Sequence, residues 1–183
     1  HPDAYAHIAT RLHALLDEYP IAYLKWDHNR DLVEAGSGPG GGSHVHAHTL
    51  ALYRLLDELK AQHPGLEIES CASGGARVDL GILDRTDRIW TSDCLDPLER
   101  LDIQRYTGLL VPPEMMGAHL TSQTVHSTAR VTDPDLSAAV AVLSHFGIER
   151  DLTTVDDAER DRIAAWVAFA KRVRPLVAHG RVV

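Results

Sequence analysis

Short apolar runs alternate with longer amphipathic stretches along this chain, and that alternation restricts its fold more than any other feature. The runs have the length of strands, and the stretches repeat apolar residues at helical spacing. Strands that alternate with helices are typical of a parallel sheet covered by helices. The sequence therefore predicts an α/β fold, and because no domain linker is evident we expect residues 1–183 to form a single domain.

Proline, glycine and polar clusters set the boundaries of the expected elements. We expect strands at residues 21–26, 66–70 and 88–92, with weaker candidates at 109–111 and 118–121. We expect helices at residues 3–18, 46–62, 77–83, 97–106, 134–145 and 157–173. The glycine-rich segment 36–43 predicts a loop, and it does not match a phosphate-binding loop.

Length and charge exclude several classes of protein. The 183 residues suffice for one domain with a core, but a complete (β/α)₈ barrel typically needs about 250. Acidic residues outnumber basic ones by 26 to 18, which argues against nucleic acid and against a charged membrane surface as partners. No apolar run approaches the roughly 18 residues of a membrane span.

Cysteine content and the first residues bear on the compartment. Cys71 and Cys94 are too few for a disulfide framework. We expect two reduced thiols in a cytoplasmic protein, and a single bridge between them is the alternative. The first residues have neither the basic nor the uncharged segment of a signal peptide.

Polar side chains follow three of the expected strands, at the point where each strand ends. Asp27 follows the first run, Ser70 and Cys71 end the second, and Asp93 follows the third. In parallel α/β folds the active site lies at the carboxyl ends of the strands. These residues are therefore the first candidates for chemistry.

Lys25, Asp27 and Asn29 occupy alternate positions, which point to the same face of a strand. The positive charge of Lys25 would keep Asp27 ionised, and its ammonium could also donate to a ligand hydroxyl. The competing interpretation makes Asp27 a helix cap or an ion-pair partner in a loop.

Two carboxylates from different strand ends are the equipment of a glycosidase. One ionised carboxylate attacks the anomeric carbon, and the other protonates the leaving oxygen. A separation of about 5–5.5 Å between them goes with retention of configuration, and one of about 6.5–9.5 Å with inversion. Asp96 competes with Asp93 for the acid role, or else caps the helix that starts at Pro97.

The run HVHAH contains His44, His46 and His48 beside the glycine-rich segment. Alternate histidines in an extended segment can share a metal ion. No carboxylate partner is evident, so we favour a loop that enters a helix and expect no metal site.

Three motifs occur in order along the chain: Lys25–Arg30 (KWDHNR), Glu69–Asp79 (ESCASGGARVD) and Trp90–Asp96 (WTSDCLD). Together they closely resemble the catalytic barrel of the bacterial and fungal α-galactosidases of glycoside hydrolase family 36, the melibiase type. The resemblance extends from about residue 1 to the end of the chain.

The resemblance implies retaining cleavage of terminal α-D-galactosides, such as melibiose and raffinose, through a covalent galactosyl–Asp intermediate. Asp27 falls on the family nucleophile, and Asp93 falls on the acid/base. The residues that match sugar-contacting positions are Lys25, Asn29, Cys71 and Gly74. Trp90, Arg77 and Asp96 match positions that support the site or pack behind it.

The resemblance further implies a partial (β/α)₈ TIM barrel, roughly strands four to eight with their helices. The family's N-terminal and C-terminal β-domains and the sugar contacts of earlier barrel strands are absent, so we expect little activity from these residues alone. The implied partner is a small carbohydrate, no cofactor is needed, and homo-oligomers are expected.

Three alternatives remain open. A galactosyltransferase of the raffinose or stachyose synthase type would use the same intermediate and pass the sugar to another sugar. A non-catalytic barrel fragment would fit the chain length. A metal-dependent barrel hydrolase would depend on the histidine run.

Overall fold

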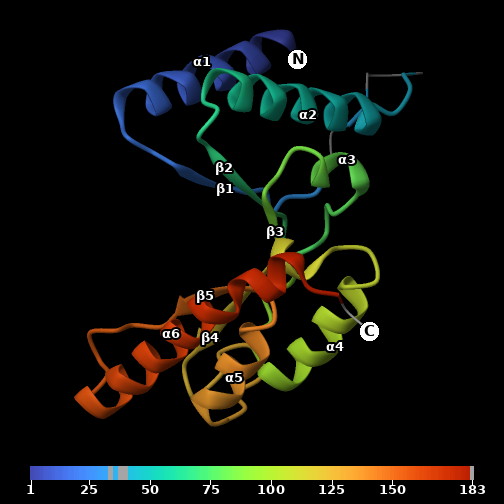
Figure 1. The fold of residues 1–183 in the computed structure, drawn as a ribbon. Coiled ribbons are helices and arrows are strands. Elements are labelled where there is room, and N and C mark those ends of the chain that lie inside the picture. Colours follow the sequence, from blue (N-terminus) through green and yellow to red (C-terminus); the bar gives the residue numbers. More distant parts are fainter. Residues whose placement is uncertain (33–34, 37–40, 182–183) are drawn as a thin grey trace. The chain divides into compact units, whose positions relative to one another are not determined.

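A computed structural model describes residues 1–32, 35–36 and 41–181 of the chain (Figure 1). The chain divides into two compact units. Unit 1 comprises residues 1–72 and 76–87, and unit 2 comprises residues 73–75 and 88–183. Both units combine parallel strands with helices, so the predicted α/β class is confirmed.

Unit 1 contains two long helices, a pair of parallel strands and one short helix. In chain order they are α1 (Pro2–Glu18), β1 (Tyr23–Asp27), α2 (Val45–Gln62), β2 (Glu67–Cys71) and α3 (Leu80–Leu83). β1 pairs with β2 in a register that places Lys25 opposite Glu69 and Asp27 opposite Cys71. The register therefore brings two of the predicted motifs to the same strand ends.

The core of unit 1 lies between its helices and one face of its strands. Leu56 and Leu59 of α2 and Ile68 of β2 are fully buried there, and Leu16 of α1 joins them. Figure 1 shows α1 and α2 running side by side over the strand pair. Burial of a Leu or Ile side chain contributes about 1.5–3 kcal/mol, so this apolar layer fixes which face of β1 is left for polar residues.

Unit 2 contains three parallel strands and three α-helices. In chain order they are β3 (Arg88–Trp90), α4 (Pro97–Thr107), a 3₁₀ turn η1 (Pro113–Met115), β4 (Met116–Thr121), α5 (Pro134–Ala141), β5 (His145–Glu149) and α6 (Asp157–His179). β4 pairs with β3 on one side and with β5 on the other. Its core packs Leu120 and Ala138 against Val155 and Ile163.

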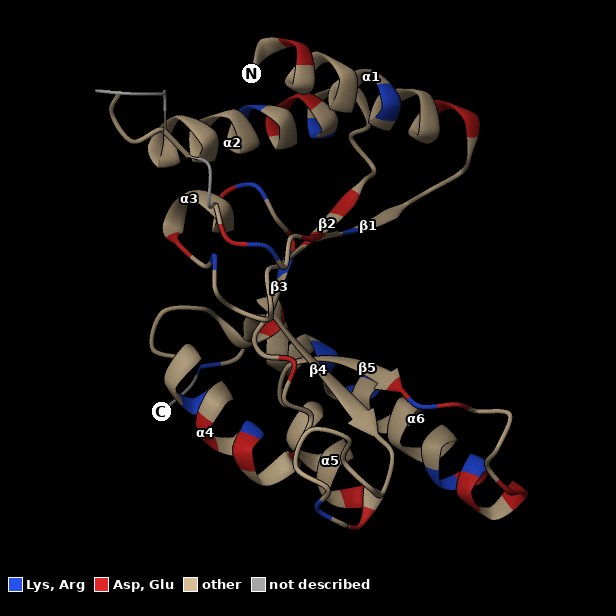
Figure 2. Cartoon of the chain, turned by 180° about the vertical axis from the view of Figure 1, so that it is seen from behind, with Lys and Arg blue, Asp and Glu red and all other residues tan. Residues whose placement is uncertain are grey.

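Aspartates start the helices of unit 2. The side chains of Asp96, Asp133 and Asp156 accept hydrogen bonds from backbone N–H groups in the first turns of α4, α5 and α6. An aspartate at this position satisfies a donor that the helix leaves unpaired. In Figure 2 the first turn of α6 carries acidic residues, which also suits the positive end of a helix dipole.

Several expected boundaries were wrong. Residues 109–111 form a turn and a bend rather than a strand, and the short helix starts at Leu80 rather than 77. α6 continues past 173 to His179. Part of the predicted loop 36–43 lies outside the described residues, and Gly36 forms an isolated bridge with Ser43.

The largest error concerns the helix expected at 134–145. α5 ends at Ala141, and His145–Glu149 is the strand β5, which the sequence did not predict. This strand contains Gly147, whose missing Cβ leaves room for the ring of His119, since a Cβ there would lie 2.6 Å from that ring. Glycine weakens the strand signal in sequence, although here it serves close packing.

No helix within the described part of the chain is both long and apolar enough to cross a membrane.

Candidate active site

Asp27 is the last residue of β1, one position beyond the strand end expected at residue 26. Alternation along the strand places Leu24 and Trp26 against the apolar core of unit 1. Lys25 and Asp27 lie on the opposite face and are exposed. The strand therefore separates a packing face from a polar face.

The carboxylate of Asp27 is surrounded by hydrogen-bond donors. Asn29 Nδ2 donates to Asp27 Oδ2 at 3.0 Å. This bond is the main reason that the pKa of Asp27 is lowered from its ordinary value; burial opposes it, and the Cys71 thiol, Lys25 and the His28 N–H add to it. Asp27 is therefore a carboxylate well below neutral pH.

Glu69 holds the ammonium group of Lys25 in place. Lys25 Nζ lies 3.2 Å from Glu69 Oε1, and the Glu69 side chain is only 6% exposed. The hydroxyl of Tyr23 donates to the other oxygen of Glu69. Sequence reasoning assigned no role to Tyr23 or Glu69, although Glu69 alternates with Cys71 along β2 and so shares its face.

Arg77 supports the segment that follows β1. Its guanidinium donates to His28 Nδ1 and, at 3.2 Å, to the carbonyl oxygen of Arg30. These bonds hold the His28 side chain and the Arg30 backbone, on either side of Asn29, the residue that donates to Asp27. Arg77 thus acts on the carboxylate through the loop and does not touch it.

Gly74 allows a close approach of two backbones in unit 2. Its φ of +80° lies in the left-handed region, and a Cβ would come within 2.6 Å of Ser92 Cα and 3.2 Å of Asp93 N. Any other residue would push the 73–75 turn away from the end of β3. Gly74 therefore shapes the surroundings of Asp93.

Asp93 lies just beyond β3 and is exposed. Trp90 Nε1 donates to Asp93 Oδ1 at 3.0 Å. The ring of Trp90 is itself buried, at 3% exposure. A buried, neutral donor from the same strand therefore fixes one oxygen of this carboxylate.

Asp96 has a different environment from Asp93, three residues away. It is fully buried, caps α4 through Leu98 N at 3.0 Å, accepts from Thr128 Oγ1 at 2.8 Å and pairs with Arg130 Nε at 2.7 Å. Although burial alone would raise it, the bonds from Thr128 and Leu98 and the charge of Arg130 leave the pKa of Asp96 lowered. The cap interpretation of Asp96 is confirmed.

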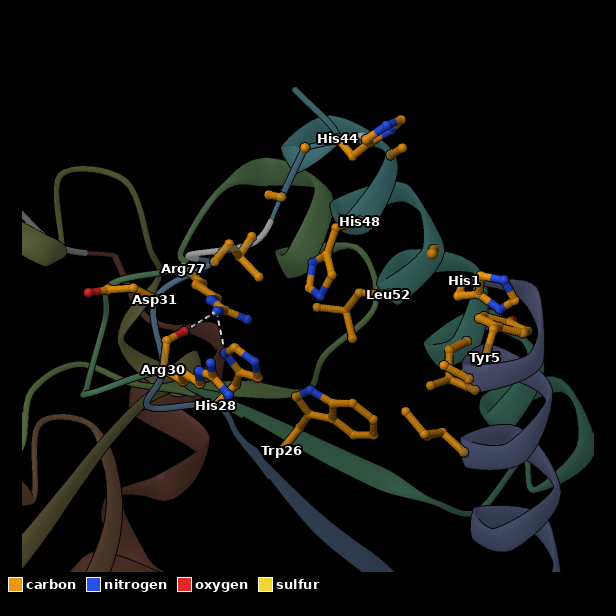
Figure 3. Close-up of a pocket in the computed structure, with 18 residues that line it drawn as sticks. His1, Tyr5, Trp26, His28, Arg30, Asp31, His44, His48, Leu52 and Arg77 are labelled. Atoms are coloured by element: carbon orange, nitrogen blue, oxygen red, sulfur yellow. Dashed lines mark hydrogen bonds between the residues drawn. The ribbon is translucent and has the colours of Figure 1, made fainter. Parts of the chain in front are cut away.

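A cavity with a volume of about 800 Å³ lies in unit 1 beside the segment that follows β1. Figure 3 shows Trp26 and Leu52 facing it, with His48 above and the pair His28–Arg77 at one end. Trp26 belongs to the packing face of β1, so this cavity and Asp27 lie on opposite faces of the strand. The polar face with Asp27 is the better candidate site.

The histidine run does not form an extended segment. Val45–Gln62 is helical and His44 precedes its first turn, so His46 and His48 lie two residues apart on a helix and do not face each other. Among the described residues, no group of three His, Cys, Asp or Glu side chains is arranged to hold a metal ion.

The predicted residues therefore form two sets. Unit 1 brings together Lys25, Asp27, Asn29 and Cys71, supported by Arg77. Unit 2 brings together Gly74, Trp90 and Asp93, with Asp96 behind them as a helix cap.

Known proteins resemble the chain over almost its whole length. A family model described as Melibiase matches residues 1–180. An α-galactosidase from Escherichia coli is 41% identical over 179 residues, which cover 98% of this chain and 25% of that protein. The α-galactosidase AgaA from Geobacillus stearothermophilus is 37% identical over 182 residues, covering 97% and 25%.

The solved structures that resemble the chain are also α-galactosidases. The crystal structure of the GH36 α-galactosidase AgaA has a TM-score of 0.91 and 38% identity, covering 97% of this chain and 25% of that one. A variant of AgaA in complex with raffinose also has a TM-score of 0.91, at 37% identity. The chain spans about a quarter of the length of the proteins it matches.

Proposed function

The chain belongs to the Melibiase family, and from that membership we propose that it carries the catalytic residues of a retaining α-galactosidase. Asp27 is the nucleophile and Asp93 is the acid/base. The substrates are terminal α-D-galactosides of the melibiose and raffinose type. A solved relative in complex with raffinose supports this substrate class.

One observation carries the proposal: Asp27 is an exposed carboxylate that its neighbours keep ionised. The donors Asn29 and Cys71 and the cation Lys25 all stabilise its charged form. A nucleophilic carboxylate needs this state, because the protonated form cannot attack an anomeric carbon. The donors also hold the carboxylate at one orientation at the end of β1.

In the first step Asp27 attacks the anomeric carbon and the glycosidic C–O bond breaks. Asp93 gives its proton to the departing oxygen, so the aglycone leaves as a neutral alcohol. The product is a galactosyl ester of Asp27. In the second step the ionised Asp93 takes a proton from water, which attacks the same carbon and restores free Asp27.

The remaining predicted residues bind the sugar or shape the site around it. Lys25 and Asn29 donate to sugar hydroxyls, since both present N–H groups on the polar face of β1. Cys71 contributes from the end of β2, opposite Asp27 in the register. Gly74 keeps the approach to the end of β3 open.

The family implies that both units are part of one catalytic (β/α)₈ barrel domain, roughly its strands four to eight. We propose that arrangement for this chain, together with a homo-oligomeric, cytoplasmic enzyme that needs no cofactor. The lengths of the relatives support the partial barrel, because the chain matches only 25% of the E. coli protein.

The test uses the E. coli α-galactosidase with its matching 25% replaced by residues 1–183, called the chimeric enzyme below. We expect it to hydrolyse melibiose and to release α-galactose first, as followed by proton NMR. The isolated chain, assayed beside it, is expected to show little activity. A chimeric enzyme that melts cooperatively yet hydrolyses no α-galactoside contradicts the proposal, and β-galactose as the first product contradicts retention.

A further inference from the structure

The buried indole of Trp90 contacts the carboxylate of Asp93 directly. Its indole N–H donates to Asp93 Oδ1 at 3.0 Å. An indole N–H is a donor only, so the bonded Oδ1 accepts and does not carry the acid proton. The orientation of the indole ring therefore decides which carboxyl oxygen is free to act on a substrate.

Arg100 of α4 lies against the same ring. The central carbon of its guanidinium is 4.5 Å from the centre of the Trp90 ring. Arg100 is 3% exposed, and its Nη1 donates to the hydroxyl of Thr91. Burial lowers the pKa of Arg100 to about 10, so it remains a cation at neutral pH.

The guanidinium also carries a buried donor that has no partner among the described residues. Arg100 Nη2 makes no hydrogen bond. A buried, unpaired donor costs free energy and calls for a compensating interaction. The contact with the face of Trp90 supplies one, since a cation held away from water over an indole ring is attracted to it.

Two further residues confine the ring of Trp90. Gly117 lies opposite Trp90 in the strand register, and a Cβ there would come within 2.9 Å of the ring. The ring of His119 lies with its centre 4.5 Å from that of Trp90, and Glu149 holds His119 Nδ1 at 2.9 Å. Gly117 and His119 belong to β4, whereas Arg100 reaches the ring from α4 and brings a charge to it.

We propose that Arg100 is a positioning residue for the acid/base Asp93: by stacking on Trp90 it holds the indole N–H on Oδ1 and so assigns the transferable proton to Oδ2. The proposal rests on the function proposed above for Asp93. The family resemblance assigned Trp90 only a supporting or packing place and assigned Arg100 none.

The proton balance of this arrangement is complete. Asp93 starts with its proton on Oδ2, gives it to the oxygen of the breaking glycosidic bond and becomes a carboxylate. The indole N–H stays on Oδ1 throughout and stabilises the carboxylate that forms. In the second step the same Oδ2 takes a proton from the attacking water, and the residue returns to its starting state.

Three variants of the chimeric enzyme test the proposal. Arg100→Met keeps a long side chain and removes the charge, and Arg100→Lys keeps the charge. Trp90→Phe keeps a ring for Arg100 to stack on and removes the donor. Arg105→Met is the matched control, because this arginine lies on the same helix and its guanidinium is 5.8 Å from the ring of Tyr106.

The readout is kcat/KM on two substrates that differ in their need for an acid. The leaving group of melibiose is a poorly acidic sugar hydroxyl, which needs a proton to depart. The leaving group of p-nitrophenyl α-galactoside is p-nitrophenolate, which departs with little help from an acid. A general acid contributes about 10²–10⁴-fold, so a displaced one should cost about 10-fold or more on melibiose. We expect that loss in Arg100→Met and Trp90→Phe, with less than about 3-fold on the aryl substrate, partial recovery in Arg100→Lys and no change in Arg105→Met.

The double variant Arg100→Met/Trp90→Phe separates positioning from general damage. If Arg100 acts through Trp90, the double variant loses no more on melibiose than the worse single variant. Additive losses, or equal losses on both substrates, overturn the proposal. If Arg100→Met does not fold, as a thermal melt would reveal, Arg100→Lys and Trp90→Phe still decide it, and an unchanged substrate ratio in Trp90→Phe overturns it.

Asp93→Asn tells the failure of this proposal from the failure of the proposed function. A selective loss on melibiose in Asp93→Asn, with none in the Arg100 and Trp90 variants, leaves the acid role intact and removes the positioning role. Equal losses on both substrates in Asp93→Asn remove the acid role itself.

Discussion

The carboxylates of Asp27 and Asp93 both lie at strand ends and are exposed, but their surroundings differ. Asp27 has a side-chain amide, a thiol and a nearby ammonium, all of which favour its charged form. Asp93 accepts a hydrogen bond from a neutral donor, the indole of Trp90, and the buried cation Arg100 interacts with its charge. The first environment suits the nucleophile proposed for Asp27, which must stay ionised, and the second suits the acid/base role proposed for Asp93.

Under the proposed function, this contrast gives chemically identical side chains separate tasks. Around Asp27 hydrogen-bond donors keep the carboxylate charged, Asn29 above all, and the charge of Lys25, which Glu69 holds in place, adds to them. Around Asp93 packing sets the orientation of the carboxylate, because the buried ring of Trp90 fixes the direction of one hydrogen bond. Substitutions at and around Asp27 and Asp93 test whether the two surroundings differ in this way.

The largest expected effect comes from exchanging each carboxylate for an amide in the chimeric enzyme. Asp27→Asn should lower kcat/KM by about 10⁴-fold or more on every substrate, because covalent attack is lost. Asp93→Asn should lower it by about 10²–10⁴-fold on melibiose and much less on p-nitrophenyl α-galactoside. Steady-state kinetics on both substrates measures the ratio.

If Asp27→Asn and Asp93→Asn lower kcat/KM by the same ratio on the two substrates, the two carboxylates do not have separate roles. Glu99→Gln is a suitable control for the loss of a carboxylate, since Glu99 is exposed on α4 and pairs with Arg130 at 3.4 Å. We expect it to change kcat/KM by less than about 2-fold, because an exposed ion pair contributes at most about 1 kcal/mol.

Asp96 is the other carboxylate that the sequence offered for the acid role, and its place as the cap of α4 predicts an effect on stability instead. We expect Asp96→Ala to lower the free energy of unfolding by about 2 kcal/mol, because it removes a helix cap together with the hydrogen bond from Thr128 and the ion pair with Arg130. Urea denaturation of the chain measures this. Asp133→Ala, at the exposed cap of α5, should cost only about 1 kcal/mol.

The pH dependence of the Asp96 contribution has a defined sign. Because the pKa of Asp96 is lowered in the folded protein, its stabilisation is complete above the ordinary value of 3.8 and is lost as the pH falls below it. Asp96→Ala should therefore flatten the acid side of the stability curve. If the two cap variants lose equal stability, Asp96 has no special structural role.

Gly74 tests whether the backbone beside Asp93 must be a glycine. Gly74→Ala should lower the free energy of unfolding by about 2 kcal/mol, since the residue is left-handed and its Cβ would meet the Ser92 backbone. Gly65→Ala is the control, because nothing lies within 4 Å of a Cβ there. Thermal melts that give equal losses for both would contradict a close approach at Gly74.

The smallest expected effect concerns the hydrogen bond from Asn29 to Asp27. Removing it in Asn29→Ala takes away the main cause that lowers the pKa of Asp27, so that pKa should rise toward 3.8. The acid limb of kcat/KM then moves to higher pH, by less than about one unit. A limb that stays in place, measured from pH 3 to 7 in the chimeric enzyme, would mean that Asn29 does not set the ionisation of Asp27.

The sequence predicted the elements that follow local rules. β1 ends in Asp27, and Asp96 caps α4, because strand alternation and helix capping involve neighbouring residues. β5 was missed because Gly147 and His145 give no local strand signal, and its place depends on packing against His119. Long-range contacts of this kind are not readable from periodicity.

The same limit applies to the candidate site. Asp27, Asn29 and Lys25 were found because they occupy alternate positions along β1 and the segment directly after it. Glu69 and Arg100 were not, since the first acts across the strand pair and the second reaches from a helix to the ring of Trp90. Both are charged residues that a sequence pattern presents as ordinary polar positions.

The most direct test of the central claim is the anomeric configuration of azide products from two variants of the chimeric enzyme. With Asp27→Gly, azide should take the place of the nucleophile and give β-galactosyl azide. With Asp93→Gly and an aryl α-galactoside, azide should instead intercept the galactosyl ester of Asp27 and give α-galactosyl azide. NMR distinguishes the anomers, and the reverse assignment, or one anomer from both variants, would contradict the division of roles between Asp27 and Asp93.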